Sequence, residues 1–170
     1  MMSVEDRKNR HTLFYSSIIF ATNAAKIAKV INSNPKNKLS NPLSNCTITT
    51  MYINAYKIWD KSQYNIEKYL NETKKYQEKD ELISNLRVII DKHQQTLKNI
   101  KDWRHLVIAH IGNNLSLATF HSLRGDVNSV LLMLEDVSEI VRNTTIFKEE
   151  NAIMSFLDYS DVQNLLFDIE

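Results

Sequence analysis

Residues 101–110, with the sequence KDWRHLVIAH, place an arginine and two histidines in a run that otherwise has the apolar spacing of a helix. Arg104 and His110 are the residues that could do chemistry. A guanidinium binds a phosphate through paired N–H donors, and an imidazole exchanges protons near neutral pH. An arginine that stabilises developing charge, with a histidine that moves a proton to or from a ribose oxygen, can cleave a phosphodiester without a metal ion.

The spacing of this pair restricts how the two side chains can meet. His110 follows Arg104 by six positions, which on an ideal α-helix separates the side chains by about 120°. They converge through the reach of the arginine, through a local distortion of the helix, or across a second subunit. We favour the second subunit, and therefore a site shared by a homodimer.

A purely structural interpretation of the same pair stays open. Arg104 lies on the inward stripe of its helix, where it needs an anionic partner because an unpaired buried charge is costly. An acidic residue of the same chain would satisfy it, and His110 would then be a capping histidine. Arg87 and His93 have the same spacing, but Val88 follows the arginine and no helix stop is apparent after His93. We therefore favour the later pair.

Other chemical groups give weaker signals. Asp102 and His105 would form half of a metal site, but a di-metal helical bundle needs a second such pair, so we expect neither a metal nor another cofactor. Trp103 and Trp59 could stack on bases, although tryptophans at helical spacing more often belong to the core. The single cysteine, Cys46, has no internal disulfide partner and indicates a reducing compartment such as the cytoplasm.

Composition bounds the class of protein. The 170 residues suit one domain over positions 1–170, and 43% hydrophobic residues with only two glycines and two prolines favour helices. A net charge of +1 excludes binding of polyanions by bulk charge, so any RNA contact needs a local patch. No stretch approaches the ~20 apolar residues of a membrane span, and we expect no membrane association. The basic residues before LFYSSIIFA give the order of a signal peptide, but serines interrupt the apolar run, which has helical spacing.

Apolar periodicity predicts an all-α, up-and-down bundle of about five to six helices. Asp126 can cap the fifth, an apolar helix that we expect to be buried on two sides, with Leu132, Met133 and Ile140 widening its stripe. The Asn, Ser and Pro residues of 32–45 predict a loop, and Gly112 marks a helix stop. The fourth helix is continuous, about 48 Å long, or bends near residues 94–98. The predicted helices span residues 5–31, 48–59, 66–73, 80–111, 126–141 and 160–169.

The run RHLVIAHIG, with the polar His105 directly after Arg104, resembles the Arg-x4-6-His signature of the HEPN superfamily. With INAYKIWDKSQYNIEKYL upstream and DVNSVLLMLEDVSEI downstream, the chain is similar to the AbiU-like branch, which is linked to phage abortive infection, over positions 46 to 142. The resemblance implies a HEPN-like helical bundle that forms a homodimer with its two motifs facing each other. In active members it implies metal-independent RNA cleavage, in which the ribose 2′-hydroxyl attacks and leaves a cyclic phosphate.

Carried over to this sequence, the resemblance makes Arg104 and His110 the catalytic residues and His105 the polar motif position. Trp103, His105 and Asn113 are candidate substrate contacts. Toxin members that pair with nucleotidyltransferase antitoxins often carry a tyrosine two positions after the motif histidine. Gly112 occupies that position here, which argues against silencing by such a partner.

Two functions follow as hypotheses. The first is a HEPN endoribonuclease that acts in phage defence or as a toxin, with RNA, a second copy of the chain and an antitoxin or defence-system protein as partners. The alternative is a catalytically inactive HEPN-like module that binds RNA, a nucleotide or a protein partner through the same groove.

Overall fold

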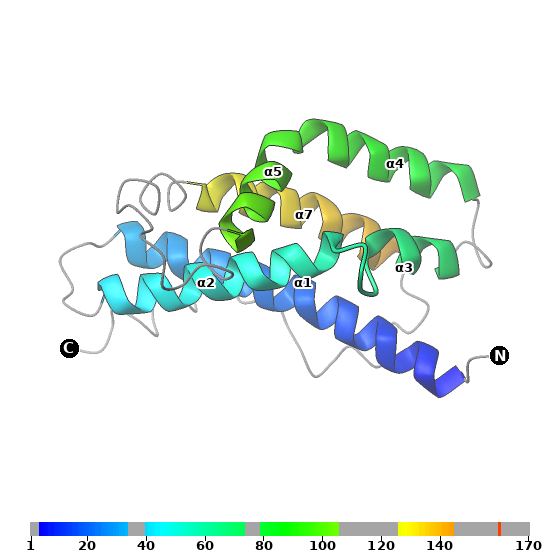
Figure 1. The fold of residues 1–170 in the computed structure, drawn as a ribbon, viewed down its shortest axis with the longest axis horizontal. Coiled ribbons are helices and arrows are strands. Elements are labelled where there is room, and N and C mark those ends of the chain that lie inside the picture. Colours follow the sequence, from blue (N-terminus) through cyan, green and yellow to red (C-terminus); the bar gives the residue numbers. More distant parts are fainter. Residues whose placement is uncertain (1–3, 34–39, 74–78, 106–125, 145–159, 161–170) are drawn as a thin grey trace.

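The computed structural model describes residues 4–33, 40–73, 79–105, 126–144 and 160. These ranges contain six helices and no strand, which confirms the all-α bundle, while the single domain over residues 1–170 stays a prediction. Figure 1 shows α1 and α2 as a long pair lying side by side, with α7 beside them and α4 beyond α7. The helices are α1 (Val4–Ser33), α2 (Ser40–Trp59), α3 (Ile66–Thr73), α4 (Lys79–Lys92), α5 (Gln94–Trp103) and α7 (Val127–Thr144).

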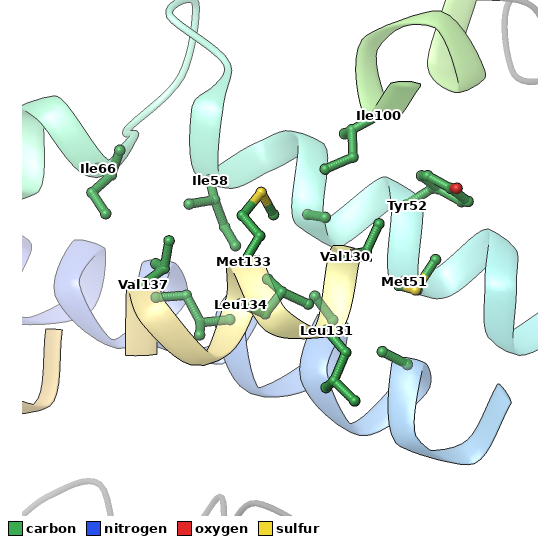
Figure 2. Close-up of a cluster of buried hydrophobic side chains, with 14 of the residues drawn as sticks. Met51, Tyr52, Ile58, Ile66, Ile100, Val130, Leu131, Met133, Leu134 and Val137 are labelled. Carbon is green, nitrogen blue, oxygen red and sulfur yellow. The ribbon is translucent and has the colours of Figure 1, made fainter. Parts of the chain in front are cut away.

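The α7 helix lies at the centre of the bundle, in contact with α1, α2, α4 and α5. Its apolar residues recur every three or four positions and face these neighbours, as predicted (Figure 2). Leu132 is the exception, because it is 56% exposed and does not widen the buried stripe. The core residues that α7 contributes are Val127, Val130, Leu131, Met133, Leu134, Val137, Ile140 and Val141.

The α2 helix begins earlier than its sequence suggests. Residues 40–45, predicted as part of a loop, form its first turns. Pro42 is tolerated there because the first N–H groups of a helix have no acceptor within the helix. The predicted end at Trp59 is confirmed.

The long fourth helix of the sequence prediction is broken at His93. Its φ and ψ of −113° and 22° leave the helical region, and α4 and α5 meet there. The break lies one residue before the predicted range of 94–98, and helix resumes directly after His93, at Gln94. The hydrogen bonds from His93 N to Ile89 O and from Leu97 N to His93 O join His93 to the last turn of α4 and to the first turn of α5.

The short α3 helix is attached to α1 through a partly buried group of polar side chains, Tyr64, Glu72 and His11. Asn65 caps α3, since its Oδ1 accepts a hydrogen bond of 3.0 Å from the Lys68 N–H. Oε2 of Glu72 accepts one hydrogen bond of 2.9 Å from the Tyr64 hydroxyl and lies 3.1 Å from His11 Nε2 on α1. Burial, and then the hydrogen bond and charge of Glu72, raise the pKa of the Tyr64 hydroxyl, so the phenol stays protonated.

Two predicted features lie outside the described residues. They are the helix stop at Gly112 and, except for Ser160, the helix over 160–169. Of the helices in the described ranges, none combines the length and apolarity needed to cross a membrane.

Candidate functional site

Two consecutive residues at the end of α5 contact two successive turns of α2. The Trp103 ring stacks on Tyr52, with ring centroids 4.8 Å apart and planes inclined by 10°. The next residue, Arg104, places its guanidinium carbon 4.1 Å from the centre of the Tyr56 ring. Because Tyr52 and Tyr56 are four residues apart, they lie on one face of α2. The pair of contacts therefore sets where the motif arginine lies on the bundle.

The backbone is distorted at the motif. Arg104 keeps right-handed helical angles, and its N–H bonds to the carbonyls of both Ile100 and Lys101. From Arg104 to His105 the chain has π-helical geometry, a wider turn that often occurs at functional sites. A local distortion was one of the three ways in which the sequence allowed the motif side chains to converge.

Asp60, one turn beyond Tyr56, supplies negative charge near Arg104. Its Oδ1 accepts hydrogen bonds from the Ser62 hydroxyl at 2.7 Å and from the Ser62 N–H at 3.0 Å. The hydroxyl bond lowers the pKa of the Asp60 carboxyl most, burial opposes it, and the charges of Arg104 and Lys68 lower it further. Asp60 is therefore ionised at neutral pH and attracts the guanidinium.

The Arg104 side chain is half-buried. Across the described ranges, no carboxylate forms an ion pair with it. The structural interpretation requires a carboxylate of the chain that pairs directly with Arg104. None of the described carboxylates does so. Instead, the guanidinium contacts the ring of Tyr56 and interacts electrostatically with Asp60.

Trp103 takes the core position, the second of the two roles considered for it. Its side chain is fully enclosed, so the ring packs against Tyr52 and is not available to stack on a base. Its Nε1, like that of Trp59, has no hydrogen-bond partner in the described part of the chain. The core interpretation of this tryptophan fits its position.

The remaining predicted site residues are only partly described. His105 is exposed, whereas His110 and Asn113 lie outside the described ranges. Asp102 forms an ion pair of 3.4 Å with Lys98. Cys46 is exposed on α2. The described residues contain no group of three or more His, Cys, Asp and Glu side chains placed to hold a metal ion.

The two residues of the second Arg-x5-His pair, Arg87 and His93, lie in different environments. Arg87 is exposed on α4, while His93 is buried and hydrogen-bonds through Nε2 with Asp136 of α7.

Sequence reasoning missed Tyr56 and Asp60 as neighbours of Arg104. The signal was available, because Tyr52, Tyr56 and Asp60 recur every four residues within the segment that carried the family resemblance.

Comparison with known proteins places the chain. The family model HEPN_AbiU2, described as AbiU2, matches residues 4–146. The chain belongs to the AbiU2 family. The match includes every described helix and Arg104, and it identifies an abortive-infection-related HEPN module. No curated protein and no solved structure shows significant similarity to this AbiU2 member.

Proposed function

We propose that this AbiU2 protein is a metal-independent endoribonuclease of the HEPN type. Arg104 binds the scissile phosphate and stabilises the charge that develops on it. His110 moves a proton to or from a ribose oxygen as the 2′-hydroxyl attacks and a cyclic phosphate forms. His105 and Asn113 are proposed substrate contacts.

The observation that carries this proposal is the set of contacts that the Arg104 guanidinium makes. The guanidinium is held at the end of α5 by an aromatic ring, without a direct carboxylate partner among the described residues. An arginine held in this way keeps its donors for a phosphate, whereas one tied into an ion pair would have to exchange partners first. Its neighbour Trp103 anchors the turn that carries it.

The proposed active form is a homodimer, in which Arg104 of one chain and His110 of the other complete each site. The proposed context is the cytoplasm, in phage defence by abortive infection or as a toxin. An antitoxin or defence-system protein would then control the activity.

Incubation of the full-length protein with RNA in the presence of EDTA tests the reaction. We expect cleavage with 2′,3′-cyclic phosphate ends, and a loss of about 100-fold to 1,000-fold for Arg104→Ala and for His110→Ala. Arg87→Ala is the matched control, since Arg87 precedes His93 at the same spacing and is exposed. Intact RNA at high protein concentration would contradict the enzyme and favour the inactive binding module.

Mixing the two inactive variants tests the shared site. If each site takes its arginine and histidine from different chains, heterodimers of Arg104→Ala and His110→Ala contain one intact site. Random exchange should then restore roughly a quarter of the wild-type activity. A monomer by size-exclusion chromatography with light scattering, or no recovery after confirmed exchange, would contradict the composite site.

A further inference from the structure

We infer that Tyr56 is a positioning residue for Arg104, and that its ring holds the guanidinium ready to bind an RNA phosphate. This inference rests on the proposed function. It adds a residue outside the Arg-x5-His motif, on a different helix, to the machinery of the site.

The contact itself is suited to this role. The guanidinium carbon lies 4.1 Å from the centre of the Tyr56 ring, well within the distance over which a cation is attracted to the face of an aromatic ring. This attraction uses no hydrogen-bond donor, so the N–H groups of the arginine stay available for phosphate oxygens.

The charge around the contact favours the same arrangement. Asp60 is ionised and close enough for the charge of Arg104 to lower its pKa, yet its Oδ1 is engaged by Ser62 and it forms no ion pair with the arginine. Asp60 attracts the cation toward this end of α2 without neutralising it. Tyr56 then determines where the guanidinium lies.

The ring is held by a rigid support. Tyr56 is half-buried and packs against the core one turn after Tyr52, which is buried under Trp103. An arginine side chain loses rotamer freedom when it binds a ligand, and a side chain held beforehand loses less. Removing the ring should therefore weaken phosphate binding by Arg104 while leaving the bundle folded.

Cleavage of RNA in EDTA by the full-length protein tests the role. Tyr56→Phe keeps the ring and should stay within about twofold of the wild-type kcat/KM, whereas Tyr56→Leu should lose about fivefold, the size of one cation–π contact. Tyr15→Leu is the control, because Tyr15 is also half-buried and packs against the same core, from α1. Equal rates for Tyr56→Leu and wild type, or equal losses in Tyr56→Phe and Tyr56→Leu, would overturn the inference.

A second measurement does not depend on catalysis. The ring current of Tyr56 should shift the NMR signal of the Arg104 Nε–H in the wild type and in Tyr56→Phe, and this shift should vanish in Tyr56→Leu. A 2′-O-methyl RNA oligonucleotide should perturb the same signal at lower concentration in the wild type than in Tyr56→Leu. If the wild type cleaves no RNA, the proposed function fails. The binding comparison then decides the inference, and equal perturbation in both proteins would overturn it.

Discussion

The imidazole Nε2 of His93 lies 2.7 Å from Oδ2 of Asp136, which joins the junction of α4 and α5 to α7. Lys92 donates a hydrogen bond of 2.7 Å to the same oxygen. One carboxylate therefore holds two consecutive residues at the point where the helix changes direction. Lys92 and Asp136 also line a cavity of about 340 Å³ between α4 and α7.

Replacing His93 should affect stability rather than chemistry. His93→Ala removes a buried hydrogen bond to an ionised partner, and we expect the free energy of unfolding to fall by about 1.5–3 kcal/mol. Urea denaturation measures this loss. The rate of RNA cleavage per folded molecule should stay within about twofold of wild type, because the catalytic role is assigned to the later pair. A loss as large as that of His110→Ala would transfer the role to Arg87 and His93.

The hydrogen bonds of Asp136 with Lys92 and His93 should make the free energy of unfolding depend on pH in the acid range. Burial raises the pKa of the Asp136 carboxyl, but the hydrogen bonds and charges of Lys92 and His93 outweigh it and leave the pKa below its usual value. A depressed folded-state pKa contributes stability above the unfolded pKa of about 3.9, and this contribution is lost as the pH falls through the folded value.

The corresponding variant is Asp136→Asn, compared with wild type by urea denaturation from about pH 5 to below pH 3. The difference in unfolding free energy between the two proteins should shrink as the pH falls. A difference that stays constant over this range would contradict an ionised Asp136 in the folded state.

The cap of α3 should contribute measurably to stability. Asn65→Ala removes the side-chain acceptor of the Lys68 N–H and should lower the free energy of unfolding by about 1 kcal/mol. Asn45→Ala is the control, because Asn45 is exposed within α2 and alanine is the better helix former. Equal effects of the two changes in chemical denaturation would exclude a specific cap.

Trp103 should behave as a core residue. Trp103→Ala removes a fully buried ring and should cost about 3–5 kcal/mol in unfolding free energy, whereas Trp103→Phe keeps an aromatic partner for Tyr52 and should cost less. Binding of a 2′-O-methyl RNA oligonucleotide to folded Trp103→Phe should match wild type in fluorescence anisotropy. A selective loss of RNA affinity would contradict a role for Trp103 in the core alone.

Sequence reasoning predicted most elements because their signals are local. The apolar stripe from Phe14 to Ala28 is buried in α1, and the spacing of Ile66, Tyr69 and Leu70 marks α3. Sequence reasoning failed where the local structure depends on a contact between distant residues, or on the position of a residue within its helix. The bend at His93 accompanies a hydrogen bond to Asp136, which lies 43 residues away. A proline breaks a helix when it lies in the interior, but Pro42 lies in the first turn of α2, where proline is tolerated.

The sequence by itself determined that the chain is helical, which faces of the helices are apolar, and that Arg104 stands in an Arg-x5-His motif. These properties follow from periodicities and residue types along a single segment. Only the tertiary structure decided that Trp103 stacks on Tyr52 and that, among the described residues, the ring of Tyr56 and no carboxylate contacts the Arg104 guanidinium. A periodic pattern specifies which face of a helix is buried. The partner it meets depends on how separate helices pack, and that packing depends on the whole chain.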